Sequence, residues 1–145
     1  MAGNKPRYRR AVAERYLDRP RVEVWRTALA AFGDPAGLED PAARSTRTVT
    51  LPDGPVAVTQ TIISLDELWR LVTDVADAPV PFHQEALVLM PRPARHAVRL
   101  GDQGRTEGCI AMLSVLVGPD DDADGPYAEA VAGEVEQRLD ALLAH

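Results

Sequence analysis

The nine residues from Cys109 to Val117 constrain the fold of this chain more than any other segment. They run Cys-Ile-Ala-Met-Leu-Ser-Val-Leu-Val, almost entirely apolar and without a polar residue at every second position. The run is far shorter than the roughly 20 residues of a membrane-spanning helix. A short apolar run without alternation is typical of a central β-strand that is covered on both faces. We therefore expect a sheet with this segment in its interior.

Four further segments have the composition of strands. Thr46–Leu51 and Val56–Ile63 are rich in Thr, Val and Ile, and Pro-Asp-Gly-Pro lies between them. Proline presets φ, aspartate bonds the neighbouring backbone and glycine accepts positive φ, so this tetrapeptide predicts a hairpin turn. Glu85–Met90 and His96–Leu100 are shorter and are predicted as two further strands.

Helical patterns separate these strands. Apolar residues recur at helical spacing from Tyr8 to Leu17, and Pro20 then interrupts the pattern, which restarts and continues to Phe32. Ser64 to Ala76 begins with a Ser-x-x-Glu capping box and carries an apolar stripe, which favours a helix. The final stretch from Pro126 to Leu142 repeats the same apolar spacing.

These elements give the order α-α-β-β-α-β-β-β-α. Because strands mostly adjoin through tight turns, we predict an α+β fold: a mostly antiparallel sheet of about five strands with helices packed on one face. A length of 145 residues fits a single domain, 1–145. A doubly wound nucleotide-binding fold requires strand–helix alternation, which this order lacks.

Charge is distributed unevenly along the chain. Residues 1–26 hold eight basic and three acidic residues, whereas residues 27–145 hold eight basic and nineteen acidic ones. The predicted basic helical segment at about 5–26 can bind an oppositely charged partner or lie against the acidic remainder of its own chain. Its candidate partner-binding residues are Arg7, Arg9, Arg10 and Arg15. Nucleic acid is a disfavoured partner, because the acidic body repels phosphates.

Known cofactor and metal motifs are missing from the sequence. It contains neither a Walker-type nor a dinucleotide-binding glycine pattern, and its single cysteine excludes a multi-cysteine zinc site. Asp120, Asp122 and Asp124 match the first half of a calcium loop, but Val131 stands where a bidentate glutamate is needed. We therefore predict no cofactor and no metal, and leave calcium binding by these aspartates open.

The best acid–base candidates are His83 and Glu85. Two residues apart on a strand, their side chains point to the same face, so Glu85 can orient His83 as a general base. Together with His96 they also have the chemistry of metal ligands, although nothing in their spacing is specific. Cys109 begins the most apolar segment, where a thiol is usually an inert core group.

Two functional hypotheses follow from this sequence. The first is a non-catalytic protein-binding or adaptor protein, chaperone-like or self-associating, acting through its surface. The alternative is a cofactor-independent small-molecule enzyme, an isomerase, cyclase or hydrolase, using His83 and Glu85 as an acid–base pair. With one unpaired cysteine, no apolar leader and no membrane-length segment, the expected location is cytoplasmic and off the membrane.

Overall fold

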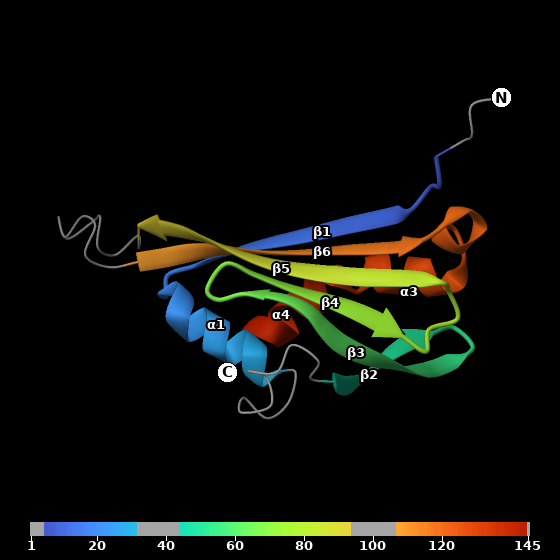
Figure 1. Cartoon of the computed structure of the whole chain (residues 1–145), viewed down its shortest axis with the longest axis horizontal. Coiled ribbons are helices and arrows are strands. Elements are labelled where there is room, and N and C mark those ends of the chain that lie inside the picture. Colours follow the sequence, from blue (N-terminus) through green and yellow to red (C-terminus); the bar gives the residue numbers. More distant parts are fainter. Residues whose placement is uncertain (1–4, 32–43, 94–106, 145) are drawn as a thin grey trace.

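One curled antiparallel sheet organises the structure (Figure 1). The computed structural model describes residues 5–31, 44–93 and 107–144. The strands in these ranges are β1 (Arg9–Leu17), β2 (Arg44–Leu51), β3 (Gly54–Asp66), β4 (Arg70–Ala76), β5 (Phe82–Pro93) and β6 (Glu107–Gly118). Their order across the sheet is β1-β6-β5-β4-β3-β2, and each neighbouring pair is antiparallel. The described part of the chain therefore confirms an α+β fold, with six strands where about five were expected.

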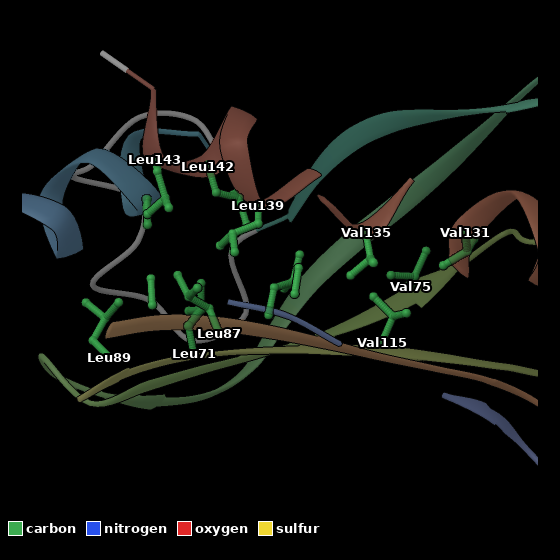
Figure 2. Packing of buried hydrophobic residues seen from close by; sticks show 14 of the residues in the cluster. Leu71, Val75, Leu87, Leu89, Val115, Val131, Val135, Leu139, Leu142 and Leu143 are labelled. Carbon is green, nitrogen blue, oxygen red and sulfur yellow. The ribbon is translucent and has the colours of Figure 1, made fainter. Parts of the chain in front are cut away.

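Helices cover the inner face of this sheet. They are α1 (Arg21–Ala30), α3 (Pro126–Gly133) and α4 (Val135–Leu143), preceded by a short 3-10 helix at Asp120–Ala123. Inward side chains of the strands meet inward side chains of the helices in one hydrophobic cluster. Figure 2 shows Leu139 and Leu142 of α4 directed toward Leu71 and Leu87 of the sheet. Fully burying a side chain of this size stabilises a fold by about 1.5–3 kcal/mol, so this packing holds the helices against the sheet.

The predicted hairpin around Pro52–Pro55 is confirmed. β2 and β3 pair from Leu51↔Gly54 to Arg44↔Thr61. Gly54 has φ 132°, a backbone conformation that residues other than glycine rarely adopt. The strand around Glu85–Met90 is also confirmed and extends to both sides as β5. The predicted strand His96–Leu100 lies outside the described residues.

The apolar segment 109–117 is a strand, as predicted, but not one covered on both faces. β6 lies between β1 and β5, second from the sheet edge. Its inward residues Cys109, Leu113 and Val115 are buried, whereas Met112 and Leu116 on the outer face are partly exposed. No described helix covers this outer face, so the apolar composition of its outer residues is not explained by burial within one chain.

The predicted helix at the N-terminal end is wrong. Residues 9–17 form β1, which pairs with β6 over its whole length, and the basic segment becomes helical only from Arg21. The apolar residues of this segment also fit a period of two, with Ala13 buried inward and Val12 facing outward. Pairing with a long internal strand satisfies the backbone of the segment better than an isolated amphipathic turn does.

The predicted helix from Ser64 to Ala76 is also wrong. Ser64–Asp66 ends β3, a tight turn follows with Leu68 at φ 70°, and β4 begins at Arg70. The β-branched residues of β4 alternate inward and outward, which outweighs the local capping signal. Trp69, which belongs to the apolar stripe of that predicted helix, is 52% exposed and packs against the Arg21 guanidinium at 4.5 Å. The observed order therefore starts with a strand and has no helix between β3 and β4.

The C-terminal helix forms where it was predicted but is interrupted. Glu134 is the C-cap of α3 and the N-cap of α4. α3 contacts β2 and also β1 and β6, whereas α4 contacts β1, β6 and α1. Tyr127 of α3 and Arg138 of α4 lie on either side of this break and contact the polar residues of the inner face.

Candidate functional site

Polar side chains interrupt the hydrophobic interior at one place. Gln60 of β3, Thr73 of β4 and both His83 and Glu85 of β5 are 1–4% exposed. Alternation along β5 directs its two residues inward, and Thr73 lies opposite Glu85 in the antiparallel register. Since a buried polar group without a partner is costly, each requires hydrogen bonds from neighbouring elements.

Two of these side chains, His83 and Glu85, form a continuous hydrogen-bonded chain with Tyr127 of α3. The His83 Nε2 atom lies 2.8 Å from Glu85 Oε2, and the His83 Nδ1 atom lies 2.8 Å from the Tyr127 hydroxyl of α3. His83 and Tyr127 are 1% and 2% exposed, and their rings meet edge to face with centroids 5.5 Å apart. The imidazole is thus held from both nitrogens, away from bulk water.

Two arginines complete the cluster from opposite sides. Arg47 of β2 donates from one Nη1 to Glu85 Oε1 at 2.8 Å and to Gln60 Oε1 at 3.1 Å. Arg138 of α4 donates to the same Gln60 oxygen at 2.7 Å, and its Nε lies 3.7 Å from Glu85 Oε1. Glu85 therefore binds groups from β2, β5 and α4, which ties the helix to the sheet.

The electrostatics of the cluster keep Glu85 ionised and Tyr127 protonated. Burial raises the pKa of Glu85, but the hydrogen bond from His83 and the charge of Arg47 outweigh it and leave that pKa well below its usual range. Burial, aided by the Glu85 charge, raises the pKa of Tyr127 to about 12. Burial and the nearby Arg47 lower the pKa of Arg138 to about 10, so it stays protonated at neutral pH.

These protonation states fix the direction of the hydrogen bonds. An ionised Glu85 can only accept, so His83 Nε2 carries a proton and donates it. In the neutral ring, Nδ1 is then an acceptor and the Tyr127 hydroxyl donates to it. If His83 gains a proton at Nδ1, that nitrogen donates to the Tyr127 oxygen instead.

The basic residues of the N-terminal segment lie against the chain's own acidic groups. Arg7 donates through Nη1 to Asp124 at 2.9 Å, and Arg9 contacts Glu129 of α3 at 3.0 Å. Arg15 bonds Asp140 of α4 through Nε at 3.0 Å and also pairs with Glu136. Arg10 follows Arg9 in β1, so its side chain points to the opposite, outer face and is exposed. Arg9 and Arg15 therefore join β1 to α3 and α4, and Arg7 joins the residues before β1 to the segment before α3.

The three aspartates of the calcium-loop pattern do not converge on one point. Asp120 accepts a hydrogen bond from the Arg7 backbone N–H at 3.1 Å, while Asp124 binds the Arg7 side chain. Within residues 5–31, 44–93 and 107–144, no group of three metal-ligating side chains lies close enough to hold a metal ion. Across the same ranges, no helix has the length and hydropathy to cross a membrane.

Cys109 is fully buried in the hydrophobic cluster beneath α1. Burial raises the pKa of its thiol, with the nearby Glu107 acting in the same direction. A thiol of this kind is a poor nucleophile. The hydrogen-bonded chain at His83 lies on other strands, so the two features are separate.

Four members of the cluster were not predicted as site residues: Arg47, Gln60, Tyr127 and Arg138. The apolar spacing from Pro126 to Leu142 does not distinguish Tyr127 or Arg138 as a site residue. For Arg47 and Gln60 a signal exists, because each takes an inward position in an alternating strand of the hairpin. A polar residue at an inward strand position indicates a buried polar partner.

The fold resembles that of START-type proteins, a curled antiparallel sheet closed by a C-terminal helix. A START superfamily protein from Mycobacterium smegmatis is 9% identical with a TM-score of 0.57, covering 92% of this chain and 93% of that one. Norcoclaurine synthase from Thalictrum, a point mutant bound to a transition-state analogue, is 10% identical (TM-score 0.58, covering 97% and 95%). Major latex-like protein 151 from Panax ginseng is 7% identical (TM-score 0.56, covering 91% and 94%).

At these identities the likeness concerns the fold alone. No protein-family profile matches the sequence, and no curated protein matches it at a significant level. What the site does must therefore be inferred from its own residues.

Proposed function

We propose that this protein is a cofactor-independent small-molecule enzyme in which His83 and Glu85 form an acid–base pair that acts through Tyr127. The observation that carries the proposal is the buried chain Tyr127–His83–Glu85, with both imidazole nitrogens bonded at 2.8 Å. Each nitrogen of this buried ring has a partner, and the two partners are a phenol and an ionised carboxylate. That arrangement suits a general base whose protonated form must be stabilised.

The proton path follows from the hydrogen-bond directions. A substrate C–H or O–H bond breaks as its proton moves to the Tyr127 oxygen, while the original hydroxyl proton moves to His83 Nδ1. The electron pair of the broken bond remains on the substrate, and Glu85 stabilises the imidazolium formed. The reverse transfer delivers the proton to another atom of the substrate, which completes an isomerisation or allows a ring to close.

The two arginines favour this reaction electrostatically. Arg47, Arg138 and Glu85 together carry one net positive charge when His83 is neutral, so a negative charge that develops on a substrate beside Tyr127 is stabilised. Gln60 fixes both guanidinium groups through one oxygen. The substrate class supported by these groups is a small organic molecule with an acidic C–H or O–H bond, such as a carbonyl compound.

One hollow in the described residues lies beside the start of α3, next to Tyr127 in the sequence. A hollow of about 530 Å³ lies between the β2–β3 turn and the start of α3, lined by Thr50, Leu51, Pro52, Pro126, Glu129 and Ala130. Pro126 precedes Tyr127, and Ala130 follows it by nearly one helical turn. The proposal requires a substrate to pass from this hollow to the Tyr127 hydroxyl, whose residue is 2% exposed. Support also comes from the fold, because one protein that shares it is a synthase solved with a transition-state analogue.

Deuterium exchange tests this proposal without knowledge of the natural substrate. The protein is incubated in D₂O with a panel of small carbonyl compounds, and deuterium incorporation at the acidic carbon is followed by mass spectrometry. We expect the wild-type protein to accelerate exchange in a subset of the panel, and His83→Gln and Tyr127→Phe to lose this acceleration. His83→Gln keeps a polar side chain at the position, and circular dichroism verifies that each variant is folded.

The control is Glu67→Gln, which removes an exposed carboxylate outside the cluster. It should leave the exchange rates unchanged. Exchange at the buffer rate for every compound, or equal exchange by the wild-type protein and folded His83→Gln, contradicts the proposal.

Protein binding is the second candidate function, because large apolar side chains are exposed on this fold. Val12, Ile63 and Trp69 are 40%, 50% and 52% exposed. An adaptor would bury such residues against a partner. A mass measurement and pull-down that find only a monomer, with no partner, would count against this second function.

A further inference from the structure

We propose that the outer face of the sheet binds the outer face of a second copy of this chain, related by a two-fold axis. This inference specifies the partner for the second candidate function and does not depend on the Tyr127–His83–Glu85 chain, which lies on the inner face. It rests on the strand register, which arranges the outward side chains in rows that run across four strands.

The central row contains small side chains. Val12 of β1 lies opposite Ser114 of β6, Ser114 opposite Ala86 of β5, and Ala86 opposite Val72 of β4. Residues directly opposite one another in an antiparallel sheet share a face, and Val12 is 40% exposed, so this row points outward.

The two flanking rows carry opposite charges at opposite ends. On one side the register places Arg10, Leu116, Gln84 and Asp74 in a row. On the other side it places Glu14, Met112, Val88 and Arg70 in a row. β1 thus presents a cation, a valine and an anion at alternate positions, and β4 presents the same three types in its own Arg70–Val72–Asp74.

This pattern complements itself under a two-fold rotation about the central row. The rotation reverses the strand direction but keeps each strand opposite its own copy. Arg10 of one copy then faces Glu14 of the other, and Asp74 faces Arg70, so four charge pairs form across the interface. Leu116 faces Met112 between them. An isologous interface requires such self-complementarity.

The next rows outward extend the apolar contact. Tyr8 and Phe82, whose rings lie 5.3 Å apart, flank Gly118 beyond one charged row. Tyr16, Ile110 and Met90 form the corresponding row beyond the other. The same rotation places these two apolar rows opposite each other, and the uncovered apolar outer residues of β6 then acquire a partner.

The area is sufficient for a weak dimer. Four strands about 4.8 Å apart and five rows about 6.7 Å apart cover roughly 600 Å² on each copy. Two copies then bury on the order of 1,200 Å², the lower end for specific interfaces. We therefore expect an association in the micromolar range rather than an obligate dimer.

Sedimentation equilibrium over a concentration series from micromolar to about 1 mM tests the interface. We expect the wild-type mass to rise toward twice 15.7 kDa. Glu14→Arg sets like charges against Arg10 of the other copy and should weaken association by about tenfold or more. Arg10→Glu with Glu14→Arg exchanges the two charges and should restore it. Asp53→Arg makes the same charge change in the exposed β2–β3 turn and should have no effect.

Two outcomes overturn the proposal. One is a wild-type protein that remains a monomer at 1 mM. The other is a dimer whose dissociation constant is the same in Glu14→Arg as in Asp53→Arg, which shows that the copies join through a different surface, such as the open edge of β1. Because both residues are exposed, the variants are expected to fold, and circular dichroism verifies it.

Discussion

Glu85 holds His83 from the same strand: its Oε2 lies 2.8 Å from His83 Nε2, and the two residues are separated by one outward-facing position of β5. The opposite carboxylate oxygen binds Arg47 at 2.8 Å. The carboxylate therefore joins the His83 imidazole to the Arg47 guanidinium in the interior. We expect the stability of the protein and its dependence on acid to reflect these two contacts.

Glu85→Gln should lower the free energy of unfolding by about 3–5 kcal/mol, because it leaves Arg47 buried without its counter-charge. Urea denaturation followed by circular dichroism measures the change. Glu67→Gln, an exposed substitution of the same chemistry, should stay within about 0.5 kcal/mol of the wild-type value. A loss as small as that of Glu67→Gln would show that Glu85 does not hold the cluster together.

Acid should destabilise the protein through Glu85. Its pKa is lowered in the folded state, so the unfolded chain binds more protons than the native one as the pH falls below the usual glutamate value of about 4.3. The contribution is fully present above that value and is lost on acidification toward the folded-state pKa. The measurement is the urea midpoint against pH, and the acid-side slope should be shallower in Glu85→Gln. Identical slopes in the two proteins would contradict the assignment.

Alkali should act through Tyr127, whose pKa is raised to about 12 from the ordinary value of 10. The folded state then retains a proton that the unfolded state loses, so this contribution is fully present below pH 10 and disappears as the pH rises through 12. The phenolate absorbance of wild-type protein minus that of Tyr127→Phe should show a titration near 12. A difference spectrum that titrates near 10 would place Tyr127 in water.

The ion pairs that align β1 with α4 should depend on salt. Arg15→Gln removes contacts with Glu136 and Asp140, which are all partly exposed, so the loss of stability should be small. It should be measurable at low ionic strength and vanish in 1 M NaCl, where exposed charges are screened. A loss that persists unchanged in high salt would mean that Arg15 acts through packing instead.

Local patterns predicted the parts of the fold that local chemistry determines. The hairpin at Pro52–Pro55 has its turn residues in the sequence, and segment 109–117 has the composition of a strand. The helix predictions were wrong for residues 9–17 and 64–76. Each segment carries apolar residues at both helical and alternating positions. Only pairing with β6, and with β3 and β5, decides between the two periods, and such pairing is not visible locally.

The candidate site was predictable only along one strand. The spacing of His83 and Glu85 implies a shared face on a strand, and the structure brings the two side chains within hydrogen-bond distance. Tyr127 and Arg138 reach them from helices more than 40 residues away in sequence. Their inward orientation depends on the break at Glu134 and on the curl of the sheet, neither of which a periodic pattern encodes.

Nitrogen NMR of the His83 ring tests the central claim most directly, because it reports where the imidazole proton lies. In the neutral ring of the folded protein we predict a proton on Nε2, directed to Glu85, and an unprotonated Nδ1 whose resonance shifts in Tyr127→Phe. A neutral ring protonated at Nδ1, or an Nδ1 resonance unaffected by Tyr127→Phe, would contradict the chain from Tyr127 through His83 to Glu85.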